Sequence, residues 1–425
     1  MIMEFRKGYG VKVDDRFSIH IAEESEEEKV AIINLCMEVH QDEVLKSLIH
    51  QILLEYPRKN EILWLYIRDD KKKEIISLIC LVPLEWQIEN IILPVCEMEF
   101  VGTLKEYRGK GFIKVLNDLY EKIIDQKGYI LSAIAGIPYF YRTLGYEYFS
   151  SLDDRIMIPA SKIPDERFKN IIIRLANLND LPFIEDKYIE FHKNYLIFNK
   201  FDTECFKFKY LNDQYNTELR STYILQDSGI SINYFSFGMS YDNQNFEISC
   251  PDLTKNEMIT LLQFIKNMGN YTSDDNITLS INKHSSLYNF IRTLGGQPIS
   301  SYGWQVKIPN LKDFIFLIKN ILESRIHDSE FKELTKTVRI SNYSETLLID
   351  FNNGKIKKIE ILKERPDPKI TDLMIPDALL FKLILGDRTI DEINYIVKDA
   401  IVNISSKSLI ETLFPKKISL LGSYI

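Results

Sequence analysis

Two short blocks of this sequence occur twice, at the same separation. Tyr141-Arg-Thr-Leu-Gly145 recurs as Ile291-Arg-Thr-Leu-Gly295, and the alternating segment 154–159, which ends in Ile-Pro, recurs as 304–309. Both pairs lie 150 residues apart. Because chance similarity would not give two separated blocks one common offset, the sequence predicts a duplicated fold, with a second copy that begins near Asn170.

The first copy contains a strand, a basic glycine turn and a helix in immediate succession. An apolar strand ends near Thr103, and Arg108-Gly-Lys-Gly111 leads into a segment whose apolar residues recur at spacings of three and four as far as Gly128. Glycines allow backbone N–H groups to converge at a helix N-terminus, where unpaired donors and the dipole favour an anion. The turn therefore predicts a diphosphate site, and an ordinary loop that happens to be basic is the alternative.

The turn matches neither a P-loop nor a dinucleotide-binding motif, but it resembles the Arg/Gln-x-x-Gly-x-Gly/Ala turn of the GNAT N-acetyltransferase superfamily. Ile113 occupies its last small position, and a bulky aliphatic residue there is similar to the Eis-type (enhanced intracellular survival) branch. The resemblance covers the element order of residues 1–150 and implies acetyl-coenzyme A as co-substrate, without a metal. The residues that it places around the coenzyme are Val101, Gly102, Thr103, Arg108, Gly109, Lys110, Gly111, Phe112, Ile113, Lys114, Gly136 and Ile137.

An aromatic segment over residues 138–146 is the second informative site. It is similar to the Eis-type pattern Tyr-x-x-x-Gly-Tyr, in which Tyr141 matches the general acid that protonates the departing coenzyme A thiolate. A phenol with a pKa of about 10 stays protonated at neutral pH, which suits that role. Tyr139 is the alternative donor if the register slips, and an aromatic plug with no catalytic role is the alternative for the whole segment.

The chain ends in an apolar segment, although chain ends usually fray in solvent. Ile418, Leu420, Leu421, Tyr424 and Ile425 favour insertion into an apolar cleft. In the Eis-type family the terminal α-carboxylate serves as the general base, so the resemblance gives this role to Ile425. The final residue of that family is commonly aromatic, and isoleucine departs from this while keeping the backbone carboxylate.

The second copy lacks a basic glycine turn before its predicted helix over residues 256–268. Pro251 and Asp252 stand where amide donors and cations would be needed, and Ile291 replaces the tyrosine. We therefore expect a GNAT-like copy that has lost coenzyme binding and contributes packing or shapes the first copy's substrate pocket. A second, independent active site is the alternative.

After Pro309 the pattern changes to an apolar helix over 311–325, three alternating strands around Asn352-Asn-Gly, and further helices. This order resembles the sterol-carrier-protein-like domain of Eis-type enzymes. Packing against the two acetyltransferase copies is the expected use of its apolar helices, and a bound lipid is the alternative.

The predicted fold class is therefore α/β with mixed sheets, in three domains. Residues 1–150 form a catalytic GNAT acetyltransferase domain and residues 151–309 a degenerate GNAT-like domain. Residues 310–425 form a sterol-carrier-protein-like α+β domain whose C-terminus reaches the active site.

Composition adds limits on location and partners. The 425 residues include no signal-peptide core and no run of about 18 apolar residues, so we expect a cytoplasmic protein without a membrane partner. Five scattered cysteines without zinc spacing are expected as reduced core residues. A formal charge of −8 argues against non-specific nucleic-acid binding and suits a cationic substrate.

The predicted function is direct transfer of an acetyl group from acetyl-coenzyme A to a primary amine. Eis-type relatives acetylate aminoglycosides, lysine-type amines or polyamines and commonly form hexamers, so a homo-oligomer is expected. Trp64, Trp86 and Glu99 are the only candidates for an amine pocket that the sequence offers. A non-catalytic GNAT-fold protein that binds acyl-coenzyme A or an apolar ligand is the alternative.

Overall fold

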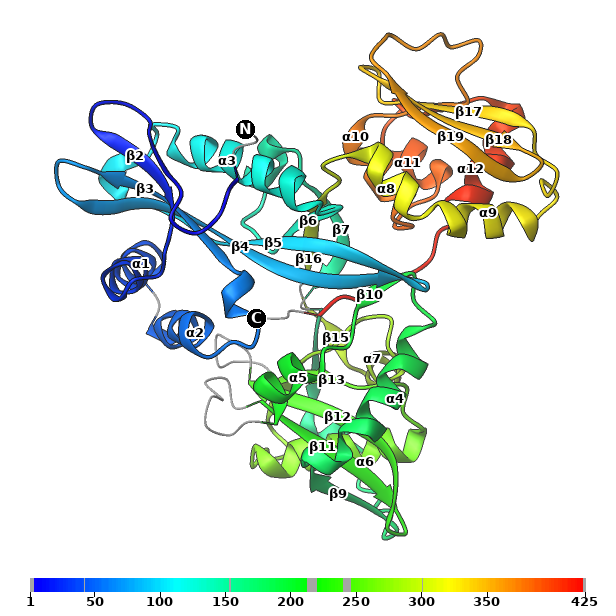
Figure 1. Cartoon of the computed structure of the whole chain (residues 1–425). Helices are drawn as coiled ribbons and strands as arrows, with labels where there is room; N and C mark the ends of the chain where they lie inside the picture. The colour runs from blue at the N-terminus through cyan, green and yellow to red at the C-terminus, as the bar shows by residue number, and fades with distance from the viewer. Residues whose placement is uncertain are drawn as a thin grey trace.

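The computed structural model describes residues 4–41, 43–152, 154–211, 220–239, 246–299 and 301–422. Within these ranges it contains three sheets of nine, seven and five strands, with helices packed on them (Figure 1). Each sheet combines antiparallel neighbours with one parallel pair. This confirms the predicted α/β class with mixed sheets. No helix among the described residues is long and apolar enough to cross a membrane.

The first sheet carries the predicted coenzyme segments. Its spatial order is β1 (Gly10–Lys12), β2 (Phe17–Ile21), β3 (Leu63–Asp69), β4 (Glu74–Ile88), β5 (Ile91–Thr103), β6 (Leu131–Ile134), β16 (Tyr302–Lys307) and β7 (Glu147–Leu152), and β10 (Ile197–Asn199) also pairs with β4. The helices α1 (Glu26–His40) and α2 (Glu43–Leu54) lie on one face, and α3 (Phe112–Lys127) lies on the other (Figure 1). A 3-10 helix, η3 (Phe140–Leu144), precedes β7.

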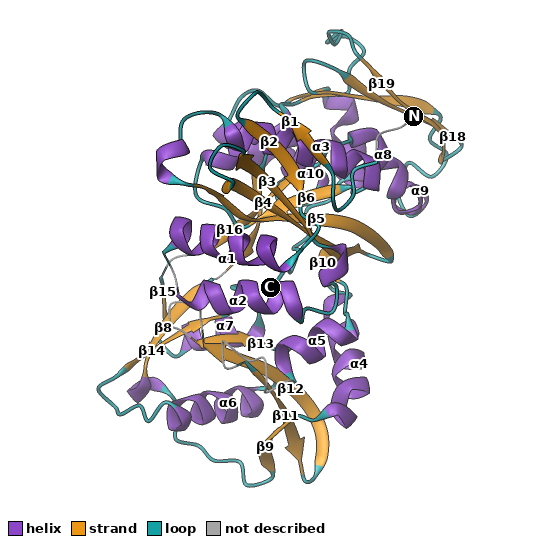
Figure 2. Ribbon diagram, turned by 60° about the vertical axis from the view of Figure 1, so that its left-hand side comes forward, coloured by secondary structure: helices purple, strands orange, loops and turns teal. Residues whose placement is uncertain are grey.

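The second sheet follows in the middle of the chain. Its order is β15 (Gln297–Pro298), β8 (Arg155–Pro159), β14 (Asn276–Ser280), β13 (Phe246–Ser249), β12 (Ile230–Met239), β11 (Ser221–Asp227) and β9 (Ile171–Leu175). Its helices are α4 (Leu181–His192), α5 (Thr203–Tyr210), α6 (Lys255–Met268) and α7 (Ser286–Thr293). Figure 2 shows α1 and α2 between the first sheet and this one.

The first and second sheets exchange one strand each. β16, which follows the second sheet in the chain, lies between β6 and β7 of the first sheet. Reciprocally, β8, which follows the first sheet, lies between β14 and β15 of the second. β8 contains residues 155–159 and β16 contains residues 304–307 of the two repeated segments. The sequence did not predict the exchange, because alternation fixes which face of a strand is buried but not which sheet the strand joins.

The third sheet lies in the last quarter of the chain. Its order is β19 (Lys355–Leu362), β18 (Thr346–Asn352), β17 (Lys336–Ser341), β20 (Leu373–Met374) and β21 (Ile401–Val402), and its helices are α8 (Leu311–Leu317), α9 (Lys319–His327), α10 (Asp377–Ile384), α11 (Ile390–Ile396) and α12 (Lys407–Leu413). The single helix predicted over 311–325 is two helices that meet at Ile318. In the predicted hairpin turn, Asn353 and Gly354 have φ values of 50° and 72°, as a two-residue turn with left-handed residues requires.

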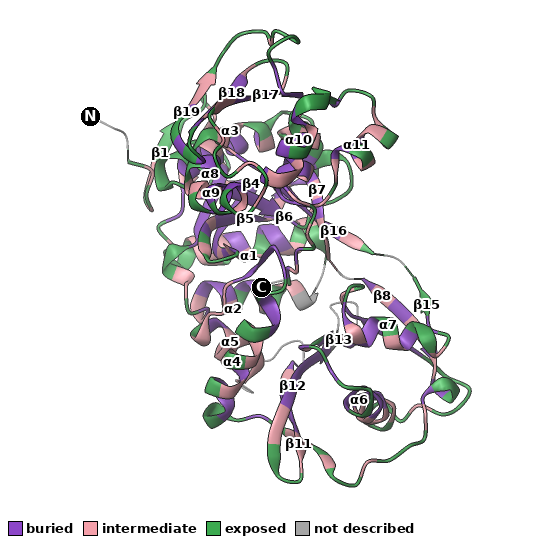
Figure 3. Ribbon diagram, turned by 90° about the vertical axis from the view of Figure 1, so that its right-hand side faces the viewer, coloured by how far each residue is buried: buried purple, intermediate pink, exposed green. Residues whose placement is uncertain are grey.

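Burial divides the described chain into two main cores. One contiguous apolar cluster joins the strands of the first sheet to those of the third, and a separate cluster lies beneath the second sheet. Figure 3 shows the buried residues concentrated along the first-sheet strands and the elements next to them. None of the five cysteines forms a disulfide among the described residues; four are buried and Cys250 is half-buried.

The strand exchange predicts reciprocal effects of two core truncations. Val306 on β16 and Ile156 on β8 are both fully buried. Val306→Ala should cost about 2 kcal/mol and Ile156→Ala about 2–5 kcal/mol of unfolding free energy, because each removes buried methyl groups. Hydrogen exchange read by mass spectrometry should accelerate in β6 and β7 for Val306→Ala, and in β14 and β15 for Ile156→Ala. If each variant instead accelerated hydrogen exchange in the other sheet, the assignment of β16 to the first sheet and β8 to the second would be contradicted.

Candidate active site

The first sheet opens where β5 and β6 separate. The two strands pair in parallel only from Val95 to Glu97 on β5, opposite Leu131 to Ala133 on β6. β5 continues to Thr103, whereas β6 ends at Ile134. Beyond Glu97, this edge of β5 therefore has no further partner in β6, and its backbone groups can pair with an extended ligand.

A β-bulge bends β5 at the same place. Leu78 on β4 pairs with Gly102, but Cys80 pairs with Glu99, so β5 contains one extra residue between these positions. Phe100, within the bulge, has a left-handed φ of 48°. A bulge bends and twists the strand that carries it, and non-glycine residues rarely adopt this conformation. The bulge thus redirects residues 101–103, the predicted coenzyme strand.

The glycine turn presents a helix N-terminus without a side-chain cap. Gly109 and Gly111 have φ values of 76° and 81°, and a Cβ on either would meet open space. Gly111 is the N-cap of α3 and provides no side-chain hydrogen bond to the helix. Arg108 Nε donates to the carbonyl oxygen of Thr103 at 3.0 Å, which ties the turn to the end of β5. Exposed amide donors and two cations, Arg108 and Lys110, therefore gather here.

The ring of Tyr141 lies beside Gly136, which follows the end of β6 by two residues. A Cβ on Gly136 would be 2.0 Å from Cε2 of the Tyr141 ring, so only glycine allows this approach. Burial, followed by the nearby charges of Glu99 and Tyr302, raises the pKa of the Tyr141 phenol above its ordinary value. The phenol therefore remains a proton donor. Tyr139, the alternative donor, is 73% exposed.

Two side chains of the exchanged strand β16 donate hydrogen bonds to Gly136. The Tyr302 hydroxyl donates to the Gly136 carbonyl oxygen, and Gln305 Nε2 donates to the same oxygen at 2.9 Å. Sequence reasoning missed both side chains, because they lie in the second copy. The repeat at 304–309 was the available signal, but it did not reveal the pairing partner of the strand.

Two carboxyl groups line β5 where the strands separate. Glu97 is buried, and its Oε2 has no hydrogen-bond partner among the described residues. Burial and then the charge of Glu99 raise the pKa of Glu97 far above its ordinary value, and burial also raises the pKa of Glu99. The sequence analysis named Glu99 but missed Glu97, although a Glu-Met-Glu run in an apolar strand was a usable signal. Trp64 and Trp86, the other two amine-pocket candidates, are fully buried core residues.

The described part of the chain end runs along β10. Leu196 donates its N–H to the Ile418 carbonyl oxygen and Leu420 donates to that of Ile197, both at 2.8 Å. Gly422 N–H donates to Asn199 Oδ1 at 2.8 Å. Because β10 pairs with β4, these bonds bring the tail against the first sheet (Figure 1). The predicted base, Ile425, lies outside the described residues, so its role stays a prediction.

The predicted coenzyme residues differ in their exposure to solvent. Those that are exposed are Arg108, Gly109, Lys110, Gly111, Lys114 and Ile137, and those that are buried or half-buried are Val101, Gly102, Thr103, Phe112, Ile113 and Gly136. Gly102 packs against α1, since a Cβ there would lie 2.8 Å from Cγ1 of Val39. Within the described ranges, no three His, Cys, Asp or Glu side chains gather as metal ligands.

Comparison with protein families agrees with this geometry. Residues 19–149 match the model described as an acetyltransferase (GNAT) domain. The matched segment contains the separated strands, the glycine turn and Tyr141. A comparison with curated protein sequences finds no match.

Solved structures share the fold over nearly the whole chain. A conserved protein of unknown function from Enterococcus faecalis V583 has a TM-score of 0.72 at 16% identity, over 96% of this chain and 99% of that one. A GCN5-related N-acetyltransferase from Anabaena variabilis has a TM-score of 0.68 at 15% identity, over 95% and 99%. Eis1 from Mycobacterium abscessus has a TM-score of 0.61 at 11% identity, over 95% and 99%. At these identities the likeness establishes the fold.

The raised pKa of Glu97 predicts a change of stability with pH. A carboxyl group whose pKa is higher in the folded state favours folding at low pH, and that stability is lost as pH rises from about 4.3 towards the folded pKa. Glu97→Gln should therefore raise the unfolding free energy, and by more at pH 8 than at pH 5. Urea unfolding at pH 5 and pH 8 measures this, with the exposed Glu27→Gln as control. An unchanged pH dependence would contradict the assignment.

Proposed function

We propose that this protein is an Eis-type N-acetyltransferase that transfers an acetyl group from acetyl-coenzyme A directly to a primary amine. The observation that carries the proposal is the open edge of β5 next to an uncapped, basic helix N-terminus and a buried tyrosine. An extended thiol arm, a diphosphate and a leaving thiolate need these three features, in that order.

The binding roles follow from the open backbone groups. The edge of residues 101–103 would hold the pantetheine arm and polarise the thioester carbonyl, because N–H donors stabilise the negative charge that develops on its oxygen. The turn Arg108–Gly111 and the first turn of α3 would hold the pyrophosphate. Gly136 and Ile137, on the other side of the opening, would line the same arm.

The chemical step needs one base and one acid. An amine attacks the carbonyl carbon only when it is neutral, so a base must accept its proton as the C–N bond forms. The α-carboxylate of Ile425 is the proposed base, and the Glu97 and Glu99 pair is the second candidate, because burial raises the pKa of both carboxyl groups and so makes their carboxylates stronger bases. As the C–S bond breaks, Tyr141 donates its phenolic proton to the thiolate and recovers one from solvent.

The remaining expectations concern acceptor and organisation. We propose an acceptor of aminoglycoside, polyamine or lysine type, a cytoplasmic location and a homo-oligomer, with a hexamer as the assembly that resemblance to the Eis-type family implies. The domains proposed are residues 1–150 for catalysis, residues 151–309 as a degenerate copy, and residues 310–425 as a sterol-carrier-protein-like unit.

A thiol-release assay with acetyl-coenzyme A and a panel of aminoglycosides, polyamines and lysine-type amines tests the activity. Coenzyme binding without turnover on any amine would favour a non-catalytic binding protein.

Charge reversal in the glycine turn should weaken coenzyme binding. Arg108→Glu combined with Lys110→Glu should raise the Kd for acetyl-coenzyme A at least about tenfold, because two cations near a diphosphate each contribute about 1 kcal/mol or more. Lys122→Glu is the matched control, since Lys122 is exposed on the same helix away from the turn. Isothermal titration calorimetry measures the change. Equal affinity in the double variant and the control would remove the diphosphate site.

Removal of one hydroxyl should separate chemistry from binding. Tyr141→Phe should lower kcat about 100-fold or more with an unchanged Kd for acetyl-coenzyme A, because a general acid contributes about 10²–10⁴ to the rate. Tyr139→Phe, at an exposed position two residues away, should leave kcat unchanged. Steady-state kinetics of thiol release measures both. A large loss with Tyr139→Phe instead would transfer the acid role to that residue.

A further inference from the structure

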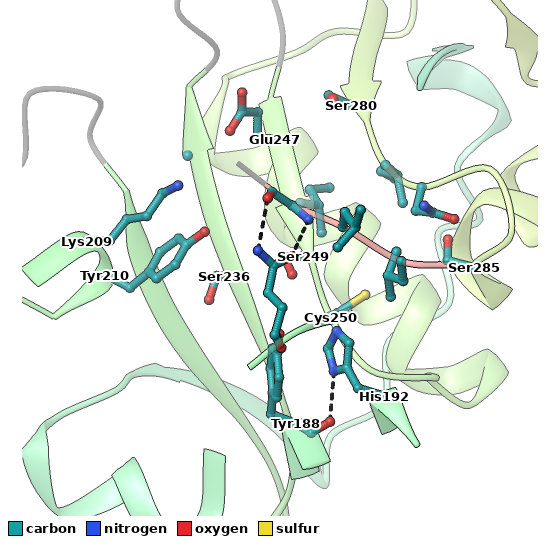
Figure 4. A pocket seen from close by; sticks show the side chains of 18 of the residues that line it. Tyr188, His192, Lys209, Tyr210, Ser236, Glu247, Ser249, Cys250, Ser280 and Ser285 are labelled. Carbon is teal, nitrogen blue, oxygen red and sulfur yellow. Dashed lines mark hydrogen bonds between the residues drawn. The ribbon is translucent and has the colours of Figure 1, made fainter. Parts of the chain in front are cut away.

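A second opening lies in the second sheet, where β13 and β14 separate. Among the described residues, these strands pair in parallel at Phe246 with Leu279 and at Glu247 with Ser280, and β13 continues to Ser249 whereas β14 ends at Ser280. A cavity of about 530 Å³ lies beyond these pairs, between the ends of β13 and β14, α4, α5 and the chain-end residues 420–422 (Figure 4). Its volume is in the range of sites for small molecules. In the fold it is the counterpart of the opening between β5 and β6.

The second opening has no place for a diphosphate. Thr254 is the N-cap of α6, its hydroxyl accepts from the Glu257 N–H, and the Glu257 carboxylate accepts from the Thr254 N–H at 2.7 Å. This capping box occupies the Glu257 amide donor and places a carboxylate at the start of α6, where the first copy has a glycine turn with two cations. The cavity is therefore not a second coenzyme site.

The walls of the cavity are rich in aromatic rings. α4 and the loop after it contribute Tyr188, Phe191 and Tyr195, and β12 contributes Tyr234 and Phe237. Rings on several sides favour a flat, apolar ligand body, because aromatic pairs add to the free energy of apolar burial.

The charged groups that line the cavity already have partners. Arg220 Nη2 pairs with Glu247 Oε2 at 3.1 Å, and Asp154 Oδ1 pairs with Lys283 Nζ at 3.6 Å. Asp202 caps α5 by accepting from two backbone N–H groups. Arg155 and Lys209 also have partners. A charged ligand would lose its hydration here without gaining a free counter-charge, so the cavity favours an uncharged one.

His192 supplies the cavity with a hydrogen-bond acceptor. Its ring stacks on Tyr188 with centroids 3.7 Å apart, and Nδ1 donates to the Tyr188 carbonyl oxygen at 2.8 Å, which leaves Nε2 as the acceptor of the neutral ring. Burial lowers the pKa of His192 to about 4, so the ring is neutral at pH 7. No hydrogen bond joins Nε2 to another described residue, and Figure 4 shows the ring between Tyr188 and Cys250 at the cavity. An acceptor on a largely buried ring that lines the cavity favours a donor from a ligand or from water.

We propose that this cavity binds a small, uncharged aromatic molecule with one hydroxyl or N–H donor, such as a phenol or an indole. Its donor bonds to Nε2 of His192, and its ring packs among the aromatic side chains of α4 and β12. The site is separate from the acetyl-transfer site, and its binding needs neither acetyl-coenzyme A nor an amine.

Four probes with one naphthalene body test this proposal by isothermal titration calorimetry on the full-length protein. They are naphthol, with a neutral donor, methoxynaphthalene, without a donor, naphthoate, an anion, and naphthylmethylamine, a cation. Naphthol should bind about 3- to 10-fold more tightly than methoxynaphthalene, the difference expected for one hydrogen bond, and both ions should bind more weakly than naphthol. No acetyl-coenzyme A is present, so the result does not depend on the proposed acetyl transfer.

Variants connect the preference to His192. His192→Phe keeps an aromatic ring but removes the acceptor, so naphthol and methoxynaphthalene should bind equally. His327→Phe, at an exposed position on α9, should keep the wild-type difference in affinity between naphthol and methoxynaphthalene. Ser249→Trp, at the exposed rim of the cavity, should block every probe and serves as a second variant if thermal melting shows that His192→Phe is not folded.

Three results would overturn the proposal. The first is no heat with naphthol at millimolar concentration, and the second is equal affinity of naphthol and methoxynaphthalene in the unchanged protein. The third is tightest binding of naphthylmethylamine, which would make the cavity a site for cationic amines instead.

Discussion

The candidate active site depends on hydrogen bonds that cross between the two halves of the chain. β16 pairs with β6 on one side and with β7 on the other, and thereby completes the first sheet. Its Tyr302 and Gln305 side chains both donate to the carbonyl oxygen of Gly136, which in turn contacts the ring of Tyr141. A strand from the second half therefore fixes the position of the proposed acid in the first. This gives the second copy a structural role in the site although it lacks a glycine turn.

The same separation of parallel strands has different chemical surroundings in the two sheets. In the first, Gly109 and Gly111 leave the amide donors of α3 open, and cations flank them. In the second, the Thr254 hydroxyl occupies the Glu257 amide donor of α6, the Glu257 carboxylate lies at the same helix end, and aromatic side chains line the neighbouring cavity. The identity of the helix cap thus decides whether an opening of this kind favours an anion or an uncharged ring.

Local sequence signals predicted the parts of the site that lie close together in the chain. The glycine turn, the helix from Phe112 to Lys127 and the short helix before Gly145 all follow from periodicity and from left-handed glycines, and the structure contains them. β4 continues without a break through Pro83 to Ile88. That proline lies where the neighbour of β4 changes from β3 to β10, so its missing N–H costs no ladder bond on that edge.

Parts that depend on distant pairing could not be predicted. The exchange of β8 and β16 has no local signature, since either strand fits either sheet by alternation alone. The same limit hid Tyr302 and Gln305, and the cavity around His192 required the joint arrangement of α4, β13 and the chain end. A seven-residue helix such as α12 is too short to give a clear periodic signal and was missed.

Two departures from ordinary local preference fall within four residues of β5. Phe100 adopts a left-handed backbone conformation, and Glu97 keeps a buried oxygen without a partner among the described residues. Both cost folding free energy, and the fully buried Val95, Cys96 and Met98 around them provide the apolar packing that offsets this cost. Such departures persist where function requires them, and here they coincide with the point at which β5 leaves β6. These two costs in β5 therefore fall where an acyl carrier would have to enter the first sheet.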